Sequence, residues 1–188
     1  ANTTADNNTA IGNFTLGDNT TGTNNTALGR DALGSNTTAS SNTAVGRSAL
    51  LLNTTGGSNT AVGTNALDAN VNGNNNVAVG NASLTSSTTA SQNTAVGGNA
   101  LDSVTTGFAN VALGFVAGGG LTTGNYNIAI GQESLEDNTA NNNTSIGSTA
   151  MKENTSGAEN TACGSQALDA NTTANSNCGF GYQSLTDN

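Results

Sequence analysis

The chain of 188 residues contains no histidine, no proline and no tryptophan, and it has only three basic side chains against twelve acidic ones. Without histidine, and with Cys163 and Cys178 as the only thiols, the chain cannot form a Ser-His-Asp or Cys-His catalytic site or a zinc site of the usual His/Cys type. The net charge of −9 disfavours binding to nucleic acid and to anionic membranes. No apolar run is long enough for a transmembrane helix or a signal-peptide core. We find no general base, metal cage or phosphate loop, and we therefore expect a protein that is not an enzyme and that uses no metal or cofactor.

The chain has instead an internal repeat of 17 residues that covers its whole length. The consensus is x-N-T-T-G/A-x-x-N-T-A-V-G-x-x-A-L-x, and the ninth unit has lost one residue near its Thr pair. A fixed period of this kind is typical of proteins whose units stack into a solenoid. The eleven units begin at Ala1, Asp18, Ser35, Leu52, Ala69, Ser86, Ser103, Gly120, Asp137, Glu153 and Ala170.

Two positions of the unit are invariant. In stacked coils an Asn column can form hydrogen bonds along the axis, each amide donating to the next, and a Gly column indicates either a positive φ or a close approach that a Cβ would block. Position 8 is Asn8, Asn25, Asn42, Asn59, Asn76, Asn93, Asn110, Asn127, Asn143, Asn160 and Asn177. Position 12 is Gly12, Gly29, Gly46, Gly63, Gly80, Gly97, Gly114, Gly131, Gly147, Gly164 and Gly181.

The unit is too short for a pair of helices, and its N-T-A-V-G segment has the alternation of a strand that ends in Gly. We therefore predict an all-β fold: a parallel β-solenoid of eleven coils that forms one segment over residues 1–188. Positions 8–11 should form one strand of each coil and positions 2–4 a second. We expect positions 9 and 11 to point into the coil. The small residue at position 10 favours close packing against another chain, although tight packing within the coil would also require Ala there. Because the chain starts and stops within the repeat, both ends should be uncapped, as in a fragment of a longer fibre or a subunit that stacks end to end.

The N-T-A-(I/V/L)-G segments with a following x-x-A-L resemble the head repeats of YadA-like trimeric autotransporter adhesins. They are also similar to the N-T-A-x-G-x-x-A-L repeats of bacterial surface fibres and phage tail fibres; examples are Asn42–Leu50, Asn59–Leu67 and Asn127–Leu135. The resemblance covers essentially the whole chain. It implies a left-handed parallel β-roll, a homotrimer of chains side by side, and an extracellular role in adhesion to a glycan or a surface receptor.

These features predict a structural or adhesive segment of an extracellular fibre that extends or presents a binding surface on a cell or virion. A first alternative is a monomeric ice-binding β-solenoid. Ice binders usually have a T-x-T pattern with two outward ranks, whereas the adjacent Thr pair here gives one, because neighbouring strand residues face opposite sides. A second alternative is a self-polymerising extracellular filament subunit. The Thr/Asn face of the ice-binding alternative comprises Thr4, Thr21, Thr38, Thr55, Thr89, Thr106 and Thr123.

Units seven and eight depart from the consensus. Apolar residues replace Asn at position 2, aromatic residues occupy variable positions, and Gly118 replaces the usual corner Leu. Clustered apolar groups on an otherwise polar fibre indicate a contact site, although they could equally repair the packing defect around the missing Leu. The candidate contact residues are Val104, Phe108, Phe115, Leu121 and Tyr126.

The two cysteines lie one coil and two residues apart in the predicted register. Their Cα atoms would be about 8 Å apart, beyond the usual limit for a disulfide, so we interpret Cys163 and Cys178 as buried free thiols. Acidic residues that gather at positions 17 and 1 around Lys152 are interpreted as a solvated face, because the G-G-x-G-x-D pattern of calcium-binding repeats is missing.

Overall fold

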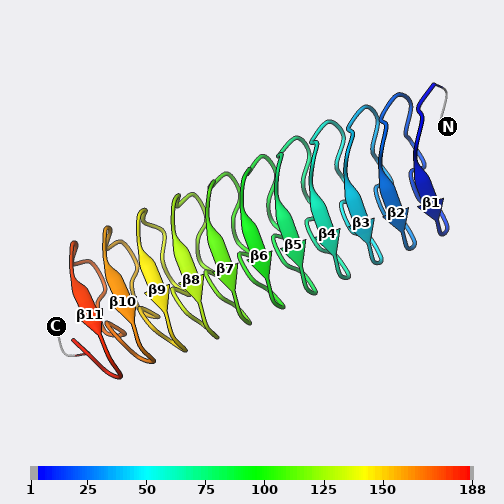
Figure 1. Ribbon diagram of the computed structural model, residues 1–188. Helices are drawn as coiled ribbons and strands as arrows, with labels where there is room; N and C mark the ends of the chain where they lie inside the picture. The colour runs from blue at the N-terminus through cyan, green and yellow to red at the C-terminus, as the bar shows by residue number, and fades with distance from the viewer. Residues whose placement is uncertain (1–3, 187–188) are drawn as a thin grey trace.

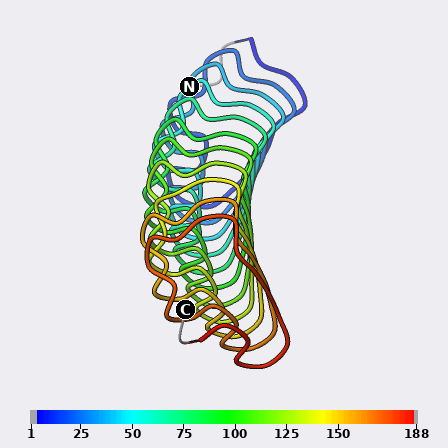
Figure 2. The same cartoon turned by 90° about the vertical axis from the view of Figure 1, so that its left-hand side faces the viewer.

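A computed structural model describes residues 4–186, and it shows one parallel β-solenoid in which each coil contributes one short strand (Figure 1). The strands pair in chain order in a single eleven-stranded parallel sheet. Successive coils keep nearly the same outline along the stack (Figure 2). The strands are β1 (Thr9–Ile11), β2 (Thr26–Leu28), β3 (Thr43–Val45), β4 (Thr60–Val62), β5 (Val77–Val79), β6 (Thr94–Val96), β7 (Val111–Leu113), β8 (Ile128–Ile130), β9 (Thr144–Ile146), β10 (Thr161–Cys163) and β11 (Cys178–Phe180).

The all-β solenoid and its 17-residue register are confirmed. Each strand residue pairs with the residue at the same position of the next coil, as Ala44 does with Ala61. The short ninth unit keeps this register, because Ile128 still pairs with Thr144. Its missing residue is absorbed at position 4, outside the sheet. Within residues 4–186 there is no helix that is long and apolar enough to cross a membrane.

The second predicted strand, at positions 2–4, is wrong. These residues form a bend in which two successive N–H groups donate to one carbonyl of the next coil. The N–H groups of Thr37 and Thr38 both donate to the carbonyl oxygen of Thr54, at 3.2 and 3.3 Å. A strand would instead alternate its donors and acceptors along the ladder, so the coils are still joined here but not by a sheet.

Besides the Gly column, the coil has left-handed backbone at three positions, where Gly118 is the one glycine among the described residues. Positions 7, 14 and 16 of each coil have positive φ, for example 63° at Ser41, 58° at Ser48 and 51° at Leu50. The left-handed region is unfavourable for Leu, so the surrounding packing must hold the Leu residues in it. These tight turns allow 17 residues with a single three-residue strand to return to the start of the next coil.

The orientation of the strands is the reverse of the prediction. Position 10 points into the coil, where Ala27, Ala44 and Ala61 are completely buried, and positions 9 and 11 point outward. The interior is filled by the Ala residues of positions 10 and 15 and the large residue of position 16, which leaves no room for Val or Ile from the strand. The buried large residues of position 16 are Leu16, Leu33, Leu50, Leu67, Leu84, Leu101, Leu135, Met151 and Leu168.

The predicted Asn ladder at position 8 is confirmed, but most of its bonds run to the backbone. The side-chain oxygen of Asn25 accepts the backbone N–H of Asn42 at 3.0 Å, and the side-chain amino group of Asn42 donates to the carbonyl oxygen of Gly56 at 2.9 Å. Direct amide-to-amide bonds also occur, as from Asn110 to Asn93 at 3.1 Å. Each of these buried amides therefore supplies partners for two backbone groups of the next coil.

A second Asn ladder runs along position 2. Asn36 donates its side-chain amino group to the side-chain oxygen of Asn19 at 2.7 Å and to the carbonyl oxygen of Ala39 at 3.0 Å. The same Ala39 carbonyl also accepts from Asn25, so it joins the two ladders. The frequent Asn at position 2 indicates such a ladder, but the prediction of a strand at positions 2–4 did not include it.

The Gly column is explained by both of the predicted causes. Gly97 has φ +137°, which L-residues rarely adopt, and a Cβ built on it would overlap the carbonyl oxygen of Gly114. Gly98, the next residue, has room: a Cβ there would make ordinary contact with the ring of Phe115 at 3.5 Å.

We predict that Gly97→Ala lowers the free energy of unfolding by about 3 kcal/mol, because the substitution adds backbone strain and a steric clash between coils. The matched variant Gly98→Ala should change it by less than about 0.5 kcal/mol. Urea unfolding followed by circular dichroism measures both values. Equal effects of the two variants would contradict this explanation of the column.

The position 2 ladder breaks at Ser87, where the side-chain oxygens of Asn70 and Ser87 are buried without a hydrogen-bond partner. We predict that Ser87→Asn raises the free energy of unfolding by about 1 kcal/mol, because the new amide can donate to Asn70. The neighbouring variant Ser86→Asn, outside the ladder, is the control and should be neutral. Thermal unfolding of both variants tests this, and a loss of stability in Ser87→Asn would show that the site has no room for the amide.

Candidate binding surface

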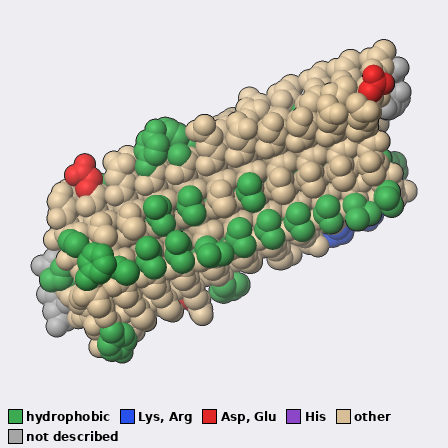
Figure 3. Space-filling model, in the orientation of Figure 1, with side chains coloured by type: hydrophobic (Ala, Val, Ile, Leu, Met, Phe, Trp, Pro, Cys, Tyr) green, Lys and Arg blue, Asp and Glu red, His purple; other side chains and the backbone are tan. Residues whose placement is uncertain are grey.

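The outward face of the strands carries a continuous apolar stripe, which we call the strand-face stripe. It consists of the side chains at position 11, none of which is buried, and Figure 3 shows a row of hydrophobic side chains that follows the length of the solenoid. At about 4.8 Å per coil the stripe is about 48 Å long. Its members are Ile11, Leu28, Val45, Val62, Val79, Val96, Leu113, Ile130, Ile146, Cys163 and Phe180.

Position 9 forms a second outward rank beside the stripe. It is Thr in most coils, but Val77, Val111 and Ile128 make it apolar near the middle of the sheet, where the apolar surface is wider. Neither rank contains a charged side chain. Strand formers occupy both ranks because the pleated surface suits β-branched residues, and the Ala core requires them to face outward. An exposed apolar surface of this length is characteristic of an interaction site.

The two cysteines belong to this outward face. Both are free, Cys163 partly exposed on β10 and Cys178 exposed on β11, so the interpretation as buried thiols is wrong. The two thiols do not form a disulfide, which agrees with the strand register. Cys178 pairs with Thr161 and Cys163 pairs with Phe180, so the two cysteines lie diagonally across neighbouring strands. Both thiols are accessible because they occupy positions 9 and 11, which point outward from the strands.

Two of the five candidate contact residues are part of the core. Val104 and Leu121 are completely buried, so they do not contribute to an exposed patch. A Cβ on Gly118 would lie 3.1 Å from a methyl group of Leu121, so Leu121 occupies the space that the missing corner Leu would fill. The interpretation as a repaired packing defect is therefore supported for Leu121, whereas for Val104 the structure shows only that it is buried in the core.

The three aromatic candidates are exposed but lie at two places. The rings of Phe108 and Tyr126 contact each other edge to face, with centroids 5.0 Å apart, in the turn that precedes the strands. Phe115 is 56% exposed and follows strand β7, where it covers Gly98. The predicted single patch therefore separates into an aromatic pair and an isolated ring.

The Thr residues of the ice-binding alternative at position 4 are exposed, but they lie in bends and not in strands. The Thr residues at position 3 use their hydroxyl groups between coils, as in the bond from Thr37 to the carbonyl oxygen of Thr54 at 3.1 Å. Position 4 therefore provides a single rank, as the spacing predicts, and this rank does not have the flatness of a sheet.

The ion pairs among residues 4–186 join Arg30 with Asp31 and Lys152 with two carboxylates. Lys152 donates to Glu133 at 2.6 Å and lies 3.2 Å from Glu136. The hydrogen bond from Lys152, with a smaller contribution from Gln132, holds the pKa of Glu133 below its usual value, and both carboxylates raise the pKa of Lys152. Within residues 4–186 no three His, Cys, Asp or Glu side chains come together as metal ligands would.

Comparison with known proteins adds no assignment to these surfaces. No protein-family model, no curated protein and no solved structure matches the chain.

We predict a small contribution of the Glu133–Lys152 contact that depends on pH. Because the folded pKa of Glu133 lies below its unfolded value, the contact stabilises the fold above the unfolded pKa of about 4.5, and this stabilisation is lost as the pH falls through the lowered value. Lys152→Met should therefore lower Tm at about pH 7 and have no effect at about pH 2. Arg47→Met, which removes an exposed cation that has no ion pair in the structure, is the control. A Tm difference that persists in acid would contradict the assignment.

Proposed function

We propose that the chain is a structural and adhesive segment of an extracellular fibre, in which copies of the solenoid pack side by side through the strand-face stripe. The observation that carries the proposal is the stripe itself: an uncharged apolar rank, present in every coil, that lies outside the core of the single chain. The repeat resemblance to the heads of trimeric adhesins and to fibre proteins supports the extracellular location and the fibre.

The size of the stripe supports association between copies. Removing the exposed part of a Val, Ile or Leu side chain from water contributes about 1 kcal/mol, and the stripe repeats this gain along about 48 Å. The core of one chain is thin, since most of its buried apolar residues are Ala, and a small apolar core alone gives marginal stability. Association would therefore add the apolar interior that a single chain lacks.

The shape of the face is compatible with a homotrimer. The two outward ranks are only about 7 Å apart, so three copies can turn the same ranks toward a common axis parallel to the solenoid. In such an arrangement each coil meets the same coil of its neighbours, and every apolar side chain finds an apolar partner. The remaining edges, which are rich in Asn, Ser and Thr, stay in water and are available for adhesion.

We predict a solution mass of three times 18.3 kDa, measured by light scattering behind a sizing column. The triple variant Val45→Asp, Val62→Asp and Val79→Asp should fold, as shown by its circular dichroism, and dissociate, because it places a stack of charges in the interface.

The matched control replaces three stacked Thr residues outside the stripe, in Thr21→Asp, Thr38→Asp and Thr55→Asp. It carries the same number of added charges in adjacent coils, and its mass should remain that of the trimer. A wild-type chain that is monomeric would exclude the proposal, and a very large, polydisperse mass would indicate an end-to-end filament instead.

One observation favours ice binding as a second candidate. The strand face presents two outward ranks, Thr at position 9 and an aliphatic residue at position 11, on a regular parallel sheet, which is the two-rank arrangement that position 4 lacks. This function requires an accessible face and hence a monomer. A monomeric chain with thermal hysteresis that Thr43→Asp and Thr60→Asp abolish would support it, whereas a trimer without hysteresis would exclude it.

A further inference from the structure

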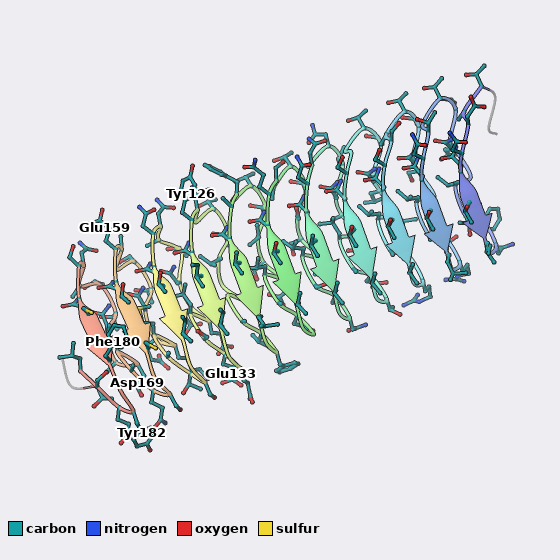
Figure 4. The ribbon with its side chains drawn as sticks, viewed as in Figure 1. Tyr126, Glu133, Glu159, Asp169, Phe180 and Tyr182 are labelled. Atoms are coloured by element: carbon teal, nitrogen blue, oxygen red, sulfur yellow. The ribbon has the colours of Figure 1, made fainter. Side chains whose placement is uncertain are left out.

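An exposed aromatic pair stands on an otherwise polar edge of the solenoid. Phe108 at position 6 of the seventh unit is 37% exposed, and Tyr126 at position 7 of the eighth unit is 58% exposed. Their rings are inclined at 77°. Figure 4 shows Tyr126 at the outer edge of the turns, away from the strands and their apolar stripe.

The fold does not require aromatic residues there. Ten coils other than that of Phe108 have a polar or small residue at position 6, and ten other than that of Tyr126 have one at position 7. Tyr126 also adopts φ 58°, a left-handed conformation that bulky residues rarely occupy and that Asn tolerates better. Every coil has positive φ at position 7, but only here does an aromatic residue occupy it, so the pair adds exposed apolar surface that the other coils do not have at this edge, and such surface is often associated with binding sites.

Carboxamide side chains occupy the same two columns in the neighbouring coils, and hydrogen bonds fix two of them. The side-chain oxygen of Asn125 accepts the backbone N–H of Phe108 at 2.9 Å, and that of Asn141 accepts the backbone N–H of Asn125 at 2.7 Å. The side-chain amino group of Asn125 also donates to the side-chain oxygen of Asn141 at 3.3 Å, and Asn141 itself is exposed, so its amino group is accessible to a ligand. Gln92 and Asn142, exposed in the position 7 column, add further amides.

No charged residue lies at positions 6 and 7 of the five coils around the pair. These residues are Asn74, Asn75, Ser91, Gln92, Phe108, Ala109, Asn125, Tyr126, Asn141 and Asn142. The surface thus combines aromatic rings with uncharged donors and acceptors. A neutral saccharide has the complementary chemistry, since it offers an apolar C–H face to an aromatic ring and a rim of hydroxyl groups to amides. Anionic ligands would find no cation here.

We propose that the Phe108–Tyr126 corner, with Asn125 and Asn141, binds a neutral saccharide. The inference rests on the proposed adhesive role and names the class of ligand that one edge of the fibre would recognise. The aromatic rings stack against the sugar ring, and the amides bind its hydroxyl groups and select among sugars.

The test uses the full chain and defined probes. Immobilised maltohexaose, cellohexaose, laminarihexaose, xylohexaose and mannohexaose are the neutral probes, and heparin and polysialic acid are the anionic ones. We expect binding to at least one neutral probe and none to the anionic probes. The double variant Phe108→Ser with Tyr126→Asn introduces residues that occur in the same columns at Ser91 and Asn142, so it should fold, and it should bind at least tenfold more weakly.

Phe115→Ser removes an exposed ring elsewhere and should retain full binding. The inference is overturned if no neutral probe binds, if only anionic probes bind, or if the double variant binds as well as the wild type. It is also overturned if the double variant dissociates the assembly, because the pair would then be an interface between copies. A trimer that binds no saccharide excludes only this inference, and a monomer that binds saccharide through the pair excludes only the side-by-side assembly.

Discussion

The satisfaction of backbone polar groups by the Asn at position 8 is the constraint on which the rest of the structure depends. A coil with one three-residue strand has few sheet hydrogen bonds, so most of its backbone groups lie in turns. The buried amide of Asn42 supplies a donor to Gly56, and that of Asn25 an acceptor for Asn42 itself. Buried groups without such partners would each cost about 1–3 kcal/mol, which a thin core could not offset. Because every coil repeats the same arrangement, each Asn completes the coil that follows it.

The narrow coil then determines which apolar residues can be inside. Tight left-handed turns at positions 7, 14 and 16 bring the backbone close to itself, and the interior admits Ala from the strand and one Leu from the corner. The β-branched residues of position 11 are consequently displaced to the outer face. The strand-face stripe is thus a product of the same packing that closes the coil, and it supplies the apolar surface from which we propose that the fibre assembles.

Units seven and eight show how the repeat accommodates a change. The ladder at position 2 is interrupted after Asn70, where the side-chain oxygens of Asn70 and Ser87 lack partners, and the next two coils replace the amide with Val104 and Leu121 before the ladder resumes at Asn138 and Asn154. Leu121 occupies the space of the missing corner Leu, so the two departures compensate each other. The outer surface of the same coils carries the only aromatic pair among residues 4–186, which places the proposed saccharide site where the interior pattern also changes.

The amino-acid sequence by itself determined the repeat, the parallel stacking, the Asn column and the Gly column, because each follows from the identity of residues at a fixed period. It did not determine which face of the strand is buried, since Thr-Ala-Val alternates equally well in either orientation. That choice depends on the volume inside the closed coil, where only Ala44 and its equivalents fit. Nor did it show that positions 2–4 form a bend, because the shared carbonyl of Thr54 is a relation between coils. The separation of Phe115 from the Phe108–Tyr126 pair likewise depends on where the turns place the side chains, and this only the tertiary structure decides.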